Sequence, residues 1–239
     1  MSTEKITNSP SAYSSLQTMW NVAVGEDTVS AVYEPATSKE RAVFVCAHGA
    51  GGNMSDRGIL SVSSELRRRG IGTVRFNFVY REMGSGRPDP MPRLKECVAA
   101  VVAHVRSELN PRILITGGRS MGGRAASMLA ADQFESEGLL LLAYPLHPAG
   151  QPAKLRDAHL PQITVPVLCI NGTRDALCNK TLMERALTTV TTDWTMHWLD
   201  GADHSFHVLK SSGRNDAQVL AEAGAAASSW VEQTVIHPT

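Results

Sequence analysis

The first candidate for chemistry is a serine enclosed by glycines, in the order Gly118-Arg119-Ser120-Met121-Gly122. The pattern G-x-S-x-G is typical of a sharp turn that exposes a serine hydroxyl, because side chains at the two glycine positions would clash with neighbouring backbone. A serine held in this way can attack a carbonyl carbon once a base takes its proton. The alternative interpretation is a glycine-rich turn that carries no chemistry.

A base and an acid follow this serine along the chain. His204 lies in a loop, Ala202-Asp203-His204-Ser205-Phe206, and can reach back to Ser120 as a general base. Asp175 follows a short apolar run, where its carboxylate can accept a hydrogen bond from the imidazole and fix the tautomer. Two alternatives remain open, namely His207 as the base and Asp203 as the acid.

A glycine-rich loop, His48-Gly49-Ala50-Gly51-Gly52, follows an earlier apolar run. Such a loop can bring a backbone N–H group against a developing oxyanion. We expect Ala50 to be this donor, with Gly51 as the next choice, and the N–H group of Met121 to be the second donor. His48 is expected to hold the loop. The alternative, a phosphate-binding loop, is disfavoured because neither G-x-G-x-x-G nor a Lys-Ser/Thr pair follows.

Three further residues are candidates for substrate binding. Tyr144 and His147 follow another apolar run and are expected to line a pocket, although a proline-rich turn packed on the sheet is an equal alternative. Arg119 can face an anionic substrate or form a structural salt bridge. His, Cys and carboxylate residues show no metal-ligand spacing, so we expect neither a metal nor another cofactor.

Alternating apolar runs and longer amphipathic stretches are expected to position these residues. The predicted strands are 42–47, 72–79, 112–116, 138–143 and 166–170, with an antiparallel pair in 16–34 and a late strand at 195–199. The predicted helices are about 59–69, 93–108, 121–133 and 180–190, with a last helix after Asn215. This alternation predicts a mostly parallel sheet covered on both faces, with the site beyond the carboxyl ends of its strands.

Composition limits the domain organisation and the partners. The 239 residues suit a single domain over 16–236, after a flexible N-terminal segment at 1–15. Equal numbers of basic and acidic residues, 23 each, give no electrostatic case for nucleic acid or an anionic membrane as a partner. The first residues are polar, so we expect no secretory leader. The four cysteines form no CxxC pair, which predicts reduced thiols in a cytoplasmic protein.

Several motifs together resemble the α/β-hydrolase superfamily, in which the order serine, acid, histidine is the rule. More narrowly, they resemble the branch of testis-expressed protein 30 and the hydrolase-like domain of the third subunit of the NSL histone-acetyltransferase complex. The matching segments are HGAGG at 48–52, GGRSMGGRAA at 117–126, YPLHP at 144–148, LRDAHL at 155–160, GTRDALC at 172–178, ADHSF at 202–206 and GRND at 213–216. The resemblance implies a single-domain α/β-hydrolase fold with Ser120 as nucleophile, Asp175 as acid and His204 as base.

These observations predict a serine hydrolase that cleaves a small ester, thioester or related acyl substrate through an acyl-enzyme. About 20 residues, 145–165, join two predicted core strands, so we expect little or no lid. Two alternatives stay open: a catalytically silent interaction subunit, and an acyltransferase or perhydrolase that uses the same residues. The sequence does not distinguish a monomer from a homodimer.

Overall fold

The computed structural model describes residues 17–236, and within them eight strands form one sheet in the order β1-β2-β4-β3-β5-β6-β7-β8. The strands are β1 (Thr18–Val24), β2 (Asp27–Glu34), β3 (Ala42–Ala47), β4 (Ile71–Phe76), β5 (Leu114–Arg119), β6 (Gly138–Leu142), β7 (Val167–Gly172) and β8 (Trp194–Leu199). β1 and β2 pair antiparallel, β2 is antiparallel to β4, and the remaining pairs are parallel. The predicted flexible segment at 1–15 lies outside the described residues.

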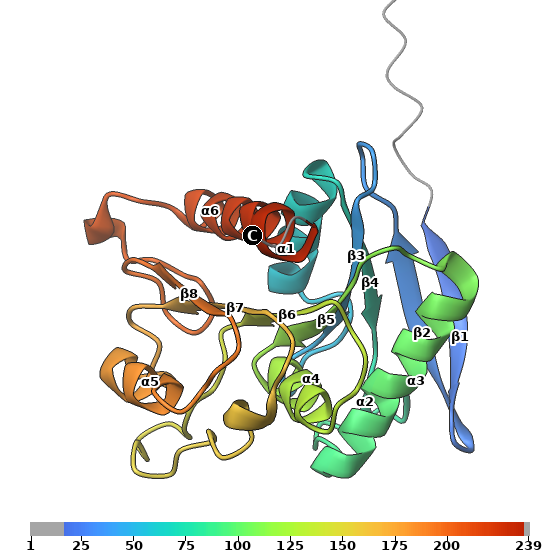
Figure 1. The fold of residues 1–239 in the computed structure, drawn as a ribbon, viewed down its shortest axis with the longest axis horizontal. Coiled ribbons are helices and arrows are strands. Elements are labelled where there is room, and N and C mark those ends of the chain that lie inside the picture. Colours follow the sequence, from blue (N-terminus) through green and yellow to red (C-terminus); the bar gives the residue numbers. More distant parts are fainter. Residues whose placement is uncertain (1–16, 237–239) are drawn as a thin grey trace, which may run out of the picture.

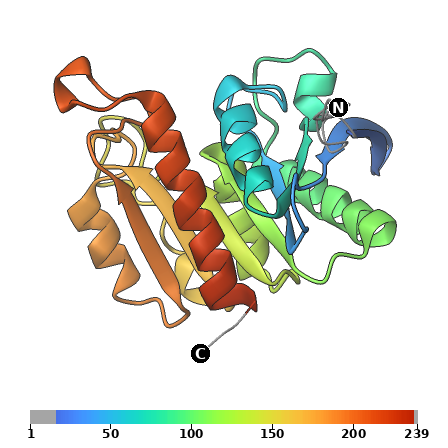
Figure 2. The same cartoon turned by 90° about the horizontal axis from the view of Figure 1, so that it is seen from above.

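Helices cover both faces of this sheet (Figure 1). They are α1 (Arg57–Arg68), α2 (Val79–Glu82), α3 (Met91–Leu109), α4 (Met121–Ala131), α5 (Lys180–Leu187) and α6 (Asp216–Trp230). α1 and α6 lie side by side on one face, and α3, α4 and α5 lie on the other (Figures 1 and 2). The expected single-domain α/β-hydrolase fold, with a mostly parallel sheet between helices, is confirmed.

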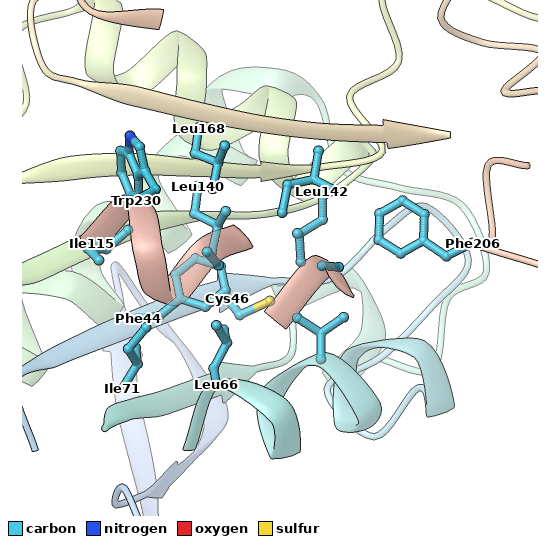
Figure 3. Packing of buried hydrophobic residues seen from close by; sticks show 14 of the residues in the cluster. Phe44, Cys46, Leu66, Ile71, Ile115, Leu140, Leu142, Leu168, Phe206 and Trp230 are labelled. Carbon is cyan, nitrogen blue, oxygen red and sulfur yellow. The ribbon is translucent and has the colours of Figure 1, made fainter. Parts of the chain in front are cut away.

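Apolar side chains on the two faces of the sheet form the core. On the face covered by α1 and α6, Phe44, Leu140 and Leu168 of the sheet pack against Leu66 of α1 and Trp230 of α6 (Figure 3). Strands buried on both faces read as continuous apolar runs, and that pattern made them recognisable in the sequence. Side-chain burial of this kind stabilises the fold by about 25 cal/mol per Å² of apolar surface.

Two elements differ from the prediction. β4 ends at Phe76, and the next apolar residues begin the short helix α2 rather than extending the strand to Val79. A short apolar run does not by itself distinguish a strand from a buried helical turn. β5 runs to Arg119, three residues beyond its predicted end at Thr116. Gly117 and Gly118 have positive φ values, which glycine tolerates, and they continue the pairing with β6.

The connection from β6 to β7 contains one short 3-10 helix, Leu160–Gln162, and no inserted helical layer. The expected absence of a lid therefore agrees with the structure. In residues 17–236 there is also no helix with the length and apolar character needed to cross a membrane.

Candidate active site

Ser120 occupies a strained turn between β5 and α4. Its φ of 50° and ψ of −115° lie outside the regions that non-glycine residues favour. Two backbone hydrogen bonds fix the turn: the Ser120 N–H group donates to the Leu142 carbonyl at 2.9 Å, and the Arg124 N–H group donates to the Ser120 carbonyl at 2.9 Å. The turn places the serine beyond the carboxyl end of the sheet, as the motif predicts.

Glycines around Ser120 are required by close backbone contacts. A Cβ atom on Gly118 would lie 2.2 Å from the carbonyl oxygen of Ala47, and one on Gly122 would lie 2.5 Å from the same atom. Gly118 also has a φ of 147°, where side chains are rarely tolerated. The spacing of the motif therefore follows from the distance between β3 and the start of α4.

The side chains of Ser120, His204 and Asp175 form a continuous hydrogen-bonded series. His204 Nε2 lies 2.9 Å from Ser120 Oγ, and His204 Nδ1 lies 2.8 Å from Asp175 Oδ2. A carboxylate only accepts hydrogen bonds, so Nδ1 carries the imidazole proton and Nε2 accepts from the serine hydroxyl. The three residues predicted from motif order are thus brought together at one edge of the sheet.

Asp175 is held by groups besides the imidazole. Its side chain is fully buried, whereas that of His204 is 25% exposed. The Leu177 N–H group donates to Oδ1 at 2.8 Å, and the Asn171 amide donates to Oδ2 at 3.1 Å. These donors satisfy a carboxylate that would otherwise be costly to bury, and they orient it toward the imidazole.

Asn171 is a site residue for which sequence analysis predicted no role. Its amide group both donates to the Tyr144 carbonyl at 3.1 Å and accepts from the Tyr144 N–H group at 3.0 Å. It thereby joins Asp175 to the segment that follows β6. The sequence feature that could have indicated this role is a polar side chain at the end of the apolar run of β7.

The alternatives for acid and base have other partners. Asp203 Oδ1 accepts from the N–H groups of Ser205 and His207, at 2.7 and 3.1 Å, and so closes the turn around His204. The His207 ring lies 3.0 Å from Asp216, and this hydrogen bond raises the pKa of the imidazole. With these partners, Asp203 does not take the place of Asp175 in the hydrogen-bonded series, and His207 does not take the place of His204.

Arg119 holds the loop that carries the imidazole. Its guanidinium donates to the carbonyl oxygen of His204 at 2.9 Å. This contact is neither of the two predicted for Arg119, which were a bound anion and a salt bridge. We interpret Arg119 as a positioning residue, because it fixes the backbone from which the imidazole extends.

The loop predicted to supply N–H groups lies beside the serine, where a Cβ atom on Gly49 would contact Ser120 Cβ at 3.5 Å. Ala50 and Gly51 are exposed, and Met121 begins α4, where the first N–H groups have no intrahelical acceptor. His48 is buried beneath the loop; its Nδ1 lies 2.8 Å from the Gly49 carbonyl.

The same ring ties this loop to the end of β4. The Phe78 N–H group donates to His48 Nε2 at 3.2 Å, so Nδ1 carries the proton and donates to the Gly49 carbonyl. Burial lowers the pKa of His48, which favours the neutral ring that this arrangement needs. The predicted loop-holding position of His48 agrees with these contacts.

The contacts of Tyr144 and His147 favour a turn packed on the sheet over the predicted lining of a pocket. Tyr144 is fully buried, and its hydroxyl donates to the Arg156 carbonyl at 2.7 Å. His147 is 4% exposed, and its Nε2 accepts from the Asn179 N–H group at 3.2 Å. The expectation that these two side chains touch a substrate is therefore corrected, because both point into the protein and are bonded there.

The cysteines do not compete with Ser120 as nucleophiles. All four are free and buried, and burial raises the pKa of Cys46, Cys97 and Cys178 to about 12. A thiol that is protonated at neutral pH is a weak nucleophile. Among the described residues, no group of three His, Cys, Asp or Glu side chains is arranged to hold a metal ion.

The sheet order and the strained turn at Ser120 define the class to which this protein belongs: α/β proteins with a sharp serine turn between a parallel strand and a helix. Residues 40–232 match the family model described as an alpha/beta hydrolase domain. The chain is therefore a member of the α/β-hydrolase family.

Solved structures show the same fold at low sequence identity. A lidless α/β serine hydrolase from Xanthomonas campestris is 20% identical, with a TM-score of 0.73, over 91% of this chain and 96% of the other. An α/β serine hydrolase homologue from Coxiella burnetii is 19% identical, with a TM-score of 0.70, over 86% of this chain and 96% of the other. Dienelactone hydrolase from Anabaena variabilis is 20% identical, with a TM-score of 0.69, over 91% of this chain and 97% of the other.

Proposed function

We propose that this protein is a serine hydrolase that cleaves a small ester, thioester or related acyl substrate. The observation that carries the proposal is the continuous hydrogen-bonded series from Ser120 Oγ through the His204 ring to Asp175. In it, Ser120 attacks the substrate carbonyl while His204 Nε2 takes the hydroxyl proton. Asp175 keeps the ring in the required tautomer and stabilises the imidazolium.

His204 then gives this proton to the leaving group, which departs as the acyl-enzyme ester on Ser120 forms. A water molecule next attacks this ester while His204 takes its proton. The bond from the acyl carbon to Ser120 Oγ breaks, His204 returns the proton to Oγ, and the acid product is released. The N–H groups of Met121 and of Ala50, or of Gly51 beside it, stabilise the oxyanion in both steps, and one such donor contributes about 3–4 kcal/mol in other serine hydrolases.

The absence of a lid limits the substrate class. The connection between β6 and β7 contains one short 3-10 helix and no inserted helical layer, so the site suits a small substrate that approaches from solvent. The lidless Xanthomonas campestris serine hydrolase and the Anabaena variabilis dienelactone hydrolase support this size class by analogy alone. The geometry of the three side chains favours an enzyme over a catalytically silent interaction subunit.

A fluorophosphonate probe tests the proposal, because it reacts only with an activated serine. We expect labelling of the native protein at Ser120 and none of Ser120→Ala. Ser205→Ala is the matched control, since Ser205 is exposed and adjacent to His204 in sequence, and it should label like the native protein. Folded native protein that stays unlabelled, or Ser120→Ala labelled to the same extent, would overturn the proposal.

Two narrower proposals concern ancestry and location. We place the chain in the branch of testis-expressed protein 30 and the NSL third-subunit domain, on the support of the segments GGRSMG and YPLHP. We also propose a cytoplasmic location, supported by four unpaired cysteines.

A further inference from the structure

Two arginines, Arg124 and Arg156, have almost no side-chain hydrogen-bond partners among residues 17–236. Arg124 lies in the first turn of α4, and Arg156 lies in the connection between β6 and β7. Two guanidinium groups offer ten N–H donors. Among the described residues the structure gives these donors one acceptor, the Pro145 carbonyl, which lies 3.3 Å from Arg156 Nη1.

Part of the Arg124 guanidinium is both buried and unpaired. Its Nε atom is buried and has no hydrogen-bond partner within residues 17–236. Several arginines elsewhere in the described chain bind carboxylates; Arg75, for example, lies 2.7 Å from Glu34. A buried guanidinium donor without an acceptor is costly, so this arrangement favours an acceptor brought by a ligand.

The two arginines are linked through the groups around them. Burial, and then the positive charge of Arg124, lower the pKa of Arg156, so the two like charges repel each other. The Tyr144 hydroxyl donates to the Arg156 carbonyl, and Ser127 Oγ donates to the Arg124 carbonyl. Asp157 and Asp132 are the carboxylates that face the adjacent His159 ring, and neither forms an ion pair with Arg124 or Arg156. Like charges placed together without a carboxylate between them attract an anion.

Neighbouring groups hold this cluster in place. Ser127 Oγ donates to the Arg124 carbonyl at 2.9 Å and lies 2.8 Å from His159 Nε2. Burial, and then the charge of Arg124, lower the pKa of His159 to about 4, so the ring is neutral at pH 7 and adds no third charge. The Tyr144 hydroxyl donates to the Arg156 carbonyl at 2.7 Å and so fixes the backbone of Arg156.

The cluster borders the proposed catalytic residues. The Arg124 N–H group bonds to the Ser120 carbonyl, and helical side chains lean toward the N-terminal end, which brings the guanidinium toward the serine turn. Tyr144, on the other side, is bonded to Asn171, which also holds Asp175. The arginines and the proposed catalytic residues are thus joined through α4 on one side and through Tyr144 and Asn171 on the other.

We propose that Arg124 and Arg156 form an anion subsite that binds a carboxylate, or a chemically similar anion, of the acyl substrate. This inference rests on the proposed hydrolase function and narrows it to anionic substrates. A guanidinium pair suits a carboxylate because each planar group can donate two parallel hydrogen bonds. The anion belongs either to the acyl part or to the leaving group.

Three esters separate these possibilities: p-nitrophenyl hexanoate, which is neutral; mono-p-nitrophenyl adipate, with a carboxylate on the acyl part; and para-carboxyphenyl hexanoate, with a carboxylate on the leaving group. We expect one anionic ester to be preferred over its neutral counterpart by kcat/KM. In Arg124→Met or Arg156→Met this preference falls at least about tenfold, the effect of losing a charged hydrogen bond. Arg124→Lys keeps the positive charge and should recover part of the preference for the anionic ester.

Lys154→Met is the matched control, because Lys154 is an exposed cation of the same connection. It should leave the preference unchanged. Equal sensitivity of neutral and anionic esters to the arginine substitutions would assign the pair to folding alone and overturn the proposal. Neutral esters hydrolysed through Ser120 with no anionic preference would also overturn it, while leaving the hydrolase function intact.

A binding measurement covers the case in which no ester is cleaved. Adipate at constant ionic strength should raise the Tm of Ser120→Ala protein, and the additional change Arg124→Met should remove the shift. Such a shift without any hydrolysis would retain the anion subsite and remove the hydrolase function. No shift in Ser120→Ala, together with no preference among the esters, would end the anion proposal.

Discussion

At the scale of single residues, the site depends on directional hydrogen bonds. Asp175 receives one N–H group from the His204 ring, one from Leu177 and one from the Asn171 amide. Only an acceptor at this position keeps the imidazole proton on Nδ1 and leaves Nε2 free for the serine hydroxyl. In the proposed mechanism the Asp175 carboxylate therefore controls the tautomer of the imidazole.

Asp175→Asn tests this assignment. The amide presents an N–H donor to the ring and stabilises the wrong tautomer, so we expect kcat for a p-nitrophenyl ester to fall about 10⁴-fold, the loss known for the same change in other serine hydrolases. The KM should change little, because the carboxylate does not face the substrate. A kcat within tenfold of the native value, in protein with a native circular dichroism spectrum, would contradict the account.

At the scale of elements, the serine turn requires β3, β5 and α4 to pack at contact distance. Gly122→Ala places a Cβ atom 2.5 Å from the carbonyl oxygen of Ala47. We expect the free energy of unfolding in urea to decrease by about 1–3 kcal/mol, the usual cost of overpacking. Gly86→Ala is the control, because Gly86 has open space around it and should change stability by less than about 0.5 kcal/mol.

His159 gives the α4 region a pH dependence. Burial lowers its folded-state pKa to about 4, whereas an unfolded histidine titrates near the ordinary value of about 6.5. Below pH 6.5 the unfolded chain therefore binds a proton that the folded chain does not, and stability falls toward pH 4. In His159→Gln the urea midpoint should fall less between pH 7 and pH 5 than in the native protein.

His207→Gln serves as a control, because the pKa of His207 is shifted in the opposite direction from that of His159. The hydrogen bond to Asp216 raises the pKa of the exposed His207 imidazole, so this ring stabilises the fold below its unfolded pKa and the contribution is lost as the pH rises. Replacing His207 should therefore make the decline in stability toward pH 5 slightly steeper. An unchanged pH profile in His159→Gln would show that this ring is not held neutral.

Motif order and strand ends predicted the grouping of Ser120, Asp175 and His204, because parallel strands end at a common edge of the sheet. The placements of Tyr144 and His147 were not predictable in the same way. Position after a strand does not show whether a side chain turns outward or into the core. The part played by Asn171 depends on contacts between β6 and β7 that only the three-dimensional structure specifies.

At the scale of the whole molecule, the sheet and helices within residues 17–236 form no lid over the site. β6 and β7 are joined by a short connection, and a solved neighbour from Xanthomonas campestris is also lidless. We expect no interfacial activation: the hydrolysis rate of p-nitrophenyl butyrate should follow a simple saturation curve through the solubility limit. A sharp rise in rate where droplets form would show that a segment of the chain covers the site in solution.

The central claim is that acyl transfer passes through the Ser120 hydroxyl. The most direct test compares steady-state hydrolysis of short p-nitrophenyl esters by the native protein and by Ser120→Ala. The account predicts turnover by the native protein, with kcat lowered at least about 10³-fold by the substitution, because the remaining groups cannot supply a nucleophile. Equal turnover by the two proteins, or none by the folded native protein across esters and thioesters, would contradict it.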